Sequence, residues 1–185
     1  ESNGSILERG GIMVDAATVA PTVTYWLELT GGNNFVDTLA MSNLHTTATA
    51  TALVGVSSTA TTRLRNSSFS VTSNAMVDYQ LHVTGDDVSV RDTSFTTSFG
   101  GHTVGPRVYL DDANRVTVDN CSIEGDLNIN APAIVLSSSE FCTISKNMIT
   151  ANPLDTLVNT VRRGISLITS SHNNKVIDNT FTGTS

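Results

Sequence analysis

The sequence repeats at intervals of about 27 residues, and this feature restricts the fold more than any other. Six triplets each place two apolar residues around a central residue, and successive triplets begin 27, 27, 27, 26 and 31 residues apart. They are Leu27-Glu28-Leu29, Val54-Gly55-Val56, Leu81-His82-Val83, Val108-Tyr109-Leu110, Ile134-Val135-Leu136 and Ile165-Ser166-Leu167. A helical period of 3.6 residues cannot hold such columns, whereas short strands of period two can.

A second series follows the triplets and has a similar interval. Each triplet is followed by a polar turn and then by a run that ends in a large apolar anchor, namely Leu44, Phe69, Phe95, Ile123, Ile149 or Phe181. Five positions before each anchor stands an aliphatic residue, and two positions before it stands Ser42, Ser67, Thr93, Cys121, Asn147 or Asn179. These two positions differ by an odd number, so both face inward only if the chain bends between them. The expected bends lie at Arg65-Asn66, Arg91-Asp92, Asp119-Asn120 and Ser145-Lys146.

Together the two series predict an all-β chain, folded as a right-handed single-stranded parallel β-helix (a solenoid) of about six coils with three short strands each. Residues 27-185 form this β-helix, and residues 1-26 form a lead-in or an incomplete first coil. Equivalent residues of stacked coils lie about 4.8 Å apart, so Leu81, Val108 and Ile134 are expected in one buried row. The chain ends four residues after Phe181, and we expect it to be a segment of a longer protein.

Composition and charge limit the partners of the chain. A net charge of −7 and a pI near 4.8 argue against nucleic acid, which requires clustered Lys and Arg. No apolar run approaches the roughly 18 residues of a membrane span, so membrane insertion is not expected. Cys121 and Cys142 form no CxxC pair and have no His nearby, so we expect no metal site and no cofactor. They fall in different columns, which does not favour a disulfide between them.

Three acidic residues are candidates for catalysis. Hydrolysis of a glycosidic bond uses two carboxylates, about 5 Å apart for retention or roughly 6.5–9.5 Å apart for inversion. Asp92 and Asp119 lie one coil apart at the predicted bend, and Glu124 follows in a loop beside them. Arg91 stacks beneath Asp119, so the alternative is a ladder of surface charges without catalytic function.

The outward column of the triplets is a candidate for glycan binding. It reads Glu28, Gly55, His82, Tyr109, Val135 and Ser166. His82 and Tyr109 are expected to be neighbours, and together they offer a sugar ring an aromatic surface and a hydrogen-bonding imidazole. Arg91 is a third glycan-binding candidate. The alternative is that Tyr109 belongs to plain surface or to a contact between subunits.

Two runs carry a resemblance to a known family, namely Arg115-Val116-Thr117-Val118-Asp119-Asn120-Cys121-Ser122-Ile123 and Asn174-Lys175-Val176-Ile177-Asp178-Asn179-Thr180-Phe181. They resemble the parallel β-helix repeats of the pectate-lyase-like superfamily and of phage tailspikes, and the similarity spans residues 27 to 181. In pectate lyases the resemblance implies a calcium site of several acids with an arginine base. Neither Arg107 nor Arg115 stands opposite such a cluster, so calcium-dependent lyase activity is not expected.

The resemblance implies a viral tail spike or tail fibre module, located in the virion tail or outside the cell, that recognises a bacterial surface polysaccharide. It also implies a homotrimer that contacts other virion tail proteins. Whether the module depolymerises its glycan, as an endo-glycosidase or a lyase, stays open. The alternative is a bacterial secreted or periplasmic β-helix protein, either a carbohydrate-active enzyme (hydrolase, lyase or epimerase) or an adhesin.

Overall fold

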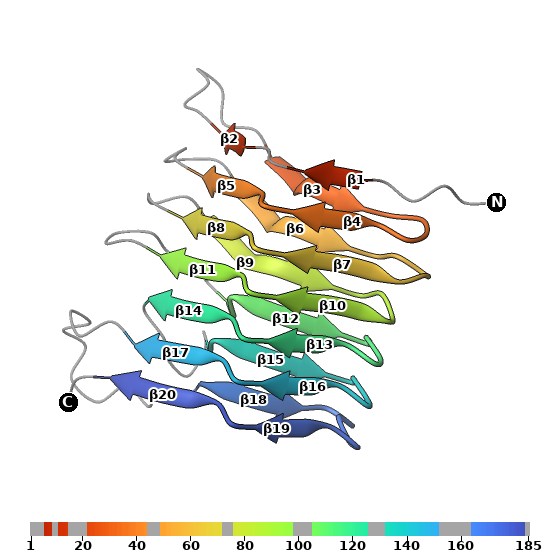
Figure 1. The fold of residues 1–185 in the computed structure, drawn as a ribbon, viewed down its shortest axis with the longest axis vertical. Helices are drawn as coiled ribbons and strands as arrows, with labels where there is room; N and C mark the ends of the chain where they lie inside the picture. The colour runs from red at the N-terminus through yellow and green to blue at the C-terminus, as the bar shows by residue number, and fades with distance from the viewer. Residues whose placement is uncertain are drawn as a thin grey trace.

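The computed structural model describes residues 6–8, 11–14, 22–43, 49–71, 76–97, 105–125, 132–151 and 164–183. The described chain winds through three parallel sheets that run side by side along one long axis (Figure 1). Within these ranges the structure contains no helix with the length and apolar character needed to cross a membrane.

Each sheet takes one strand from each successive coil. Sheet A contains β1 (Ile6–Glu8), β4 (Phe35–Asp37), β7 (Thr62–Arg65), β10 (Val88–Arg91), β13 (Thr117–Asp119), β16 (Thr143–Ser145) and β19 (Lys175–Ile177). Sheet B contains β2 (Gly11–Val14), β5 (Ala40–Asn43), β8 (Ser68–Val71), β11 (Ser94–Thr97), β14 (Ser122–Gly125), β17 (Met148–Ala151) and β20 (Thr180–Gly183). Sheet C contains β3 (Thr22–Leu29), β6 (Thr49–Val56), β9 (Met76–Val83), β12 (Val108–Asp111), β15 (Ile134–Ser137) and β18 (Ile165–Ile168). The predicted all-β parallel solenoid with three strands per coil is therefore confirmed.

The apolar columns of the sequence form the core. In sheet C, Val108 pairs with Leu81 on one side and with Ile134 on the other, and all three side chains are fully buried. Stacking brings like side chains into contact along the axis; the rings of Phe69 and Phe95, for example, have centroids 5.5 Å apart. One continuous dry interior thus joins segments that are about 27 residues apart in the sequence.

A left-handed residue turns the chain from sheet A into sheet B in each coil. Positive φ angles between 50° and 57° occur at the second residue of each predicted bend and at its equivalents in the other coils: Thr38, Asn66, Asp92, Asn120, Lys146 and Asp178. Asn and Asp tolerate this conformation better than most residues because their short polar side chains bond locally. The bend that the odd spacing predicts is confirmed.

The prediction that Leu44 is the first anchor is wrong. Phe69 pairs with Met41, three residues before the expected anchor Leu44, which lies outside the described residues. Leu39 therefore takes the inward position next to the bend, where its N–H donates to Ser67 Oγ at 3.2 Å. Ser42 instead pairs with Ser70 in sheet B and is only partly buried. Met41 and Leu44 are both apolar, so the sequence pattern alone did not distinguish them.

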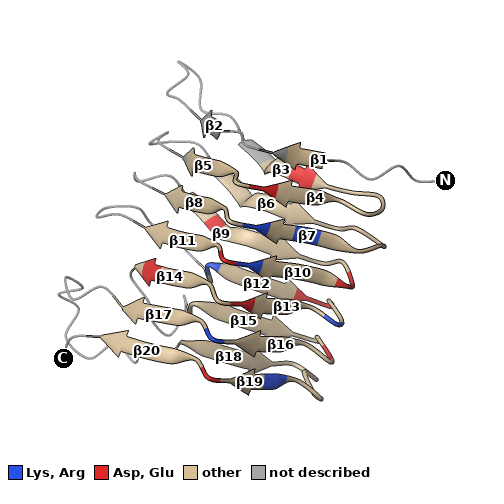
Figure 2. Cartoon of the chain, viewed as in Figure 1, with Lys and Arg blue, Asp and Glu red and all other residues tan. Residues whose placement is uncertain are grey.

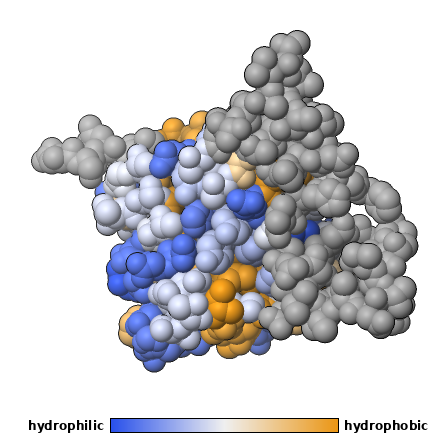
Figure 3. All heavy atoms as spheres, turned by 180° about the vertical axis from the view of Figure 1, so that it is seen from behind, coloured by the Kyte–Doolittle hydropathy of each residue, from blue (hydrophilic) through white to orange (hydrophobic). Residues whose placement is uncertain are grey.

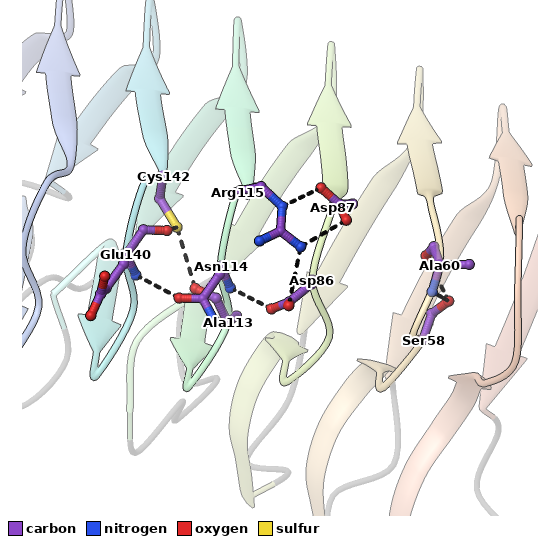
Figure 4. A network of polar contacts seen from close by, with 9 residues as sticks. All are labelled: Ser58, Ala60, Asp86, Asp87, Ala113, Asn114, Arg115, Glu140 and Cys142. Carbon is purple, nitrogen blue, oxygen red and sulfur yellow. Dashed lines mark hydrogen bonds and ion pairs between the residues drawn. The ribbon is translucent and has the colours of Figure 1, made fainter.

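The turns between sheets C and A are joined from coil to coil by polar side chains (Figure 4). Arg115 binds both oxygens of Asp87, with its Nε 2.7 Å from one and its Nη2 2.9 Å from the other, and also reaches Asp86 at 3.3 Å. The Asp86 carboxylate in turn accepts the Asn114 N–H at 2.8 Å. Asp86 and Asp87 are thus turn residues whose carboxylates join one turn to the next.

The last coil exposes side chains that are interior in the other coils. Leu167, Val176 and Phe181 belong to the inward columns, yet they are 45%, 42% and 55% exposed because no described strand follows β18, β19 or β20 in its sheet. From behind, Figure 3 shows a hydrophobic area in the lower part of a mainly hydrophilic surface.

Candidate functional site

Strand β9 of sheet C contains a bend that changes which side chains face outward. In β9, the N–H groups of both Gln80 and Leu81 donate to the same carbonyl, that of Arg107, at 3.1 and 2.9 Å. Two residues thus oppose one, which is the arrangement of a β-bulge. Gln80 and Leu81 are both fully buried, and the residues on either side of them, Tyr79 and His82, are only partly buried. Tyr79 and His82 therefore share the outer face although their spacing is odd.

Four rings meet on this outer face, and we call them the aromatic platform: Tyr25 from β3, Tyr79 and His82 from β9, and Tyr109 from β12. Tyr109 stacks on Tyr79 and on His82, with ring centroids 4.6 and 5.4 Å apart. His82 also contacts Tyr79 at 5.2 Å and Tyr25 at 6.0 Å between centroids. All four side chains are partly buried, so each presents part of its ring to the surface.

Tyr25 reaches across a neighbouring coil to join the platform. Its hydroxyl lies 3.0 Å from Nδ1 of His82, a residue 57 positions later. Gly55 of β6 lies between them, because it pairs with Glu28 on one side and His82 on the other. A Cβ atom on Gly55 would lie 2.5 Å from the Tyr25 ring. The missing side chain is what lets Tyr25 lie across the sheet toward His82.

Burial and acidic neighbours set the protonation of the platform. Burial lowers the pKa of His82 and is partly opposed by Asp111, whose Oδ2 lies 3.9 Å from His82 Nε2. Burial raises the pKa of Tyr25, and Glu28 and Asp111 raise it further. The pKa of Tyr79 is also raised, first by burial and then by Tyr109 and Asp78. At neutral pH Tyr25, Tyr79 and His82 are therefore uncharged, and the charged groups beside them are carboxylates.

The structure brings together two of the three predicted glycan-binding residues. His82 and Tyr109 pair in adjacent strands of sheet C, as expected. Arg91 lies in β10 of sheet A, away from them. Sequence reasoning missed Tyr25 and Tyr79, because each lies an odd number of residues from the outward column and strict alternation would turn it inward. Their spacing of 54 residues, two coil intervals, was the available signal.

The three predicted catalytic acids lie apart: Asp119 belongs to sheet A, Glu124 belongs to sheet B, and Asp92 lies at the bend between these sheets. Asp92 lines a shallow polar groove along the bend between sheets A and B, together with Asn66, Ser67, Ser68, Thr93, Ser94, Asn120 and Ser122. Its Oδ1 accepts the Asn120 amide at 2.6 Å. Asp92 is the only one of the three candidate acids that lines this groove.

Asp119 and Glu124 occupy other settings. Asp119 ends β13, pairs with Arg91 across the sheet, and accepts the Ser145 hydroxyl at 2.6 Å. The Arg91 guanidinium is 3.9 Å from Asp119 Oδ2, in line with the ladder of surface charges considered as the alternative. The prediction that Glu124 lies in a loop is wrong, because it lies in β14 and pairs with Thr96 and Thr150 on the exposed face of sheet B. The catalytic roles of these residues stay predictions.

The described part of the chain contains neither a group of metal-binding side chains nor a reactive thiol. None of its His, Cys, Asp and Glu residues form a group of three or more that could hold a metal ion. Cys121 and Cys142 are buried free thiols. Burial raises the pKa of Cys121 to about 12, and it also raises the pKa of Cys142. Both residues fill the core as unreactive small side chains.

Comparisons with known proteins bear on the fold. A family model described as "Right handed beta helix region" matches residues 25–185, which is most of the chain. Searches of curated proteins and of solved structures gave no match.

Proposed function

Because the chain belongs to the right-handed β-helix region family, we propose that it is a carbohydrate-recognising module that binds a glycan on the aromatic platform of sheet C. The observation that carries this proposal is the meeting of four partly exposed rings on one face of a parallel sheet. The family fits carbohydrate-active and adhesin-like β-helix proteins.

Sugar rings have an apolar C–H face and a polar edge, and aromatic side chains offer a matching surface with polar tips. The hydroxyls of Tyr25, Tyr79 and Tyr109 and the imidazole of His82 supply donors and acceptors beside the ring faces. The platform extends over four consecutive strands of sheet C, β3, β6, β9 and β12. At about 4.8 Å per strand, it suits an oligosaccharide better than a single sugar.

Titration of a panel of capsular and lipopolysaccharide glycans by calorimetry tests the proposal. We expect a glycan that binds the natural chain and loses about fivefold or more in affinity in Tyr79→Ala and in Tyr109→Ala, since stacked aromatic contacts contribute about 1 kcal/mol or more each. Phe141→Ala is the matched control, because Phe141 is 58% exposed in the turn before β16. The proposal would be contradicted if the control variant lost as much affinity for the glycan, or if neither tyrosine substitution changed the affinity.

The finer assignment that we propose is a viral tail spike or tail fibre module that recognises a bacterial surface polysaccharide, in the virion tail, as a homotrimer beside other tail proteins. The repeats that resemble those of phage tailspikes support it. A stable monomer of the complete protein, measured by mass, would count against the trimer. The second candidate is a bacterial secreted or periplasmic adhesin or carbohydrate-active enzyme. A virion attachment domain next to this segment favours the first, and a secretion signal favours the second.

Depolymerisation is a separate proposal centred on the polar groove. Asp92 supplies a carboxylate there, and the hydroxyls and amides around it suit the polar edges of sugars. If the chain shortens a glycan, we expect Asp92→Asn or Asp119→Asn to abolish turnover while binding to the platform survives. Unchanged turnover in both variants would remove these residues as catalysts.

A further inference from the structure

The exposed basic residues of the described chain are confined to one side of it, whereas its acidic residues are not. The exposed basic residues all lie in sheet A or in the turns next to it: Arg63, Arg65, Arg91, Arg115, Lys146 and Lys175. The remaining described basic residue, Arg107, is fully buried. Figure 2 shows blue segments on β7, β10 and β19 of sheet A, and red segments both on sheet A, at β4 and β13, and on β3, β9 and β14. Of the described basic residues, none is exposed on the outer face of sheet C.

The aromatic platform has acidic neighbours instead. Asp111 ends β12 and lies 3.9 Å from His82 Nε2. Glu28 of β3 is exposed and acts electrostatically on Tyr25, and Asp78 of β9 is exposed and acts on Tyr79. His82 itself adds no positive charge at neutral pH, because burial holds its pKa low. The platform is thus an uncharged aromatic surface with three carboxylates around it.

Such a surface favours one kind of ligand. An ammonium group is attracted both by the faces of aromatic rings and by nearby carboxylates. A uronic acid or a phosphorylated sugar would meet like charges here and would lose affinity from them. A neutral sugar would gain the stacking contact but nothing from the carboxylates.

We propose that the aromatic platform selects glycans that carry ammonium groups, as polymers of amino sugars without N-acyl groups do. The sugar ring stacks on the exposed parts of Tyr79 and Tyr109, and its ammonium group lies near Asp111, which ends the same strand as Tyr109. This inference rests on the proposed function, because it names the class of glycan that the same platform takes.

The test compares two ligands that differ in charge but little in ring structure. Glucosamine oligomers and N-acetylglucosamine oligomers of equal length are titrated into the natural chain by calorimetry, in weakly acidic buffer at physiological salt, where the free amines are protonated. We expect the glucosamine oligomer to bind about tenfold more tightly. Tyr79→Ala should weaken both ligands, whereas Asp111→Asn should remove most of the preference between them.

Asp112→Asn is the matched control. Asp112 is the exposed residue next to Asp111, has a φ of 53° that Asn tolerates, and is not one of the carboxylates that act on the platform rings. The substitution Asp112→Asn changes the net charge of the chain by the same amount as Asp111→Asn does. A preference that survives Asp111→Asn, or that falls equally in both variants, would reflect the overall negative charge and would overturn the inference.

The remaining outcomes separate this inference from the proposed function. If both oligomers bind equally, or if only a neutral or acidic glycan binds and does so through Tyr79, the preference for ammonium groups is wrong and the glycan platform stands. If no glycan of any charge binds, both proposals fall.

Discussion

One residue in each coil holds the left-handed conformation that turns sheet A into sheet B, and the residue type at this position differs between coils. Asn66, Asp92 and Asn120 suit it, and Lys146 does not, although its φ is 54°. A residue that is not Gly, Asn or Asp loses roughly 1 kcal/mol in this conformation. The sequence predicted the bend from odd spacing, but the spacing carries no information on φ.

Replacement of Lys146 by Asn should therefore stabilise the fold. We expect the free energy of unfolding in urea to rise by about 0.5–1 kcal/mol, because Asn adopts the required φ more readily. The reciprocal change, Asn120→Lys, should destabilise the chain by at least as much, since it also removes the bond to Asp92. A destabilised Lys146→Asn variant would show that the lysine makes a compensating contact.

The imidazole of His82 should make stability depend on pH. Its side chain is 11% exposed and is faced by Tyr25 of β3, by Tyr79 of β9, and by Tyr109 and Asp111 of β12. Burial lowers its pKa in the folded state despite the opposing effect of Asp111. The folded chain then binds fewer protons than the unfolded chain, so stability falls as the pH drops below about 6.5.

Urea unfolding measured between neutral and mildly acidic pH checks this expectation. The decline in unfolding free energy should be smaller in His82→Gln than in the natural chain. His172→Gln serves as the control, because His172 lies exposed in a turn beside Glu140. The same decline in His82→Gln as in the natural chain would contradict the assignment to His82.

At the scale of elements, adjacent coils are joined by side chains that bond to backbone groups. Asn147 is 1% exposed; its Oδ1 accepts the Cys121 N–H at 2.9 Å, and its Nδ2 donates to the Val118 carbonyl at 3.0 Å and to Asn179 at 2.9 Å. Ser67 and Asn147 belong to the column that the sequence shows two residues before the anchors, and both bond to neighbouring coils. The partners were not predictable, because they are backbone groups of other coils.

Asn147→Ala should destabilise the chain by about 3 kcal/mol, because it leaves the buried Cys121 N–H without its acceptor and also removes the bonds to the Val118 carbonyl and to Asn179. Asn114→Ala is the matched control. Asn114 Oδ1 accepts the Glu140 N–H at 3.1 Å in a similar bond between coils, but Asn114 is only partly buried, so water replaces the lost bond. We expect a loss of about 1 kcal/mol or less there. Chemical denaturation compares the two, and equal losses would contradict the role of burial.

The bulge in β9 could not be predicted from the periodicity of the sequence. The triplet columns predicted that His82 and Tyr109 are neighbours, because strict alternation holds within each triplet. It fails upstream, where Gln80 and Leu81 both point inward, and so Tyr25 and Tyr79 were not recognised as members of the site. A local count of apolar positions cannot detect a bulge that depends on a carbonyl of the next coil.

At the scale of the whole molecule, each coil is stabilised by the coils on either side of it. Leu110, Leu136 and Leu167 pair in one column, but Leu110 is fully buried and Leu167 is 45% exposed. Leu110→Ala should reduce the free energy of unfolding by about 3 kcal/mol, and Leu167→Ala by less than about 1 kcal/mol. Because both variants make the same substitution in the same column, the difference between their unfolding free energies gives the contribution of the covering coil. Urea unfolding measures both values. Similar losses at both sites would contradict this dependence on neighbouring coils.

The bulge at Gln80 has a consequence for how such a surface arises. Deletion of one residue there would restore strict alternation, and Tyr79 would then exchange its outward position for an inward one while the strand beyond it kept its pairing. A solenoid can in this way gain or lose a recognition surface through a change of one codon.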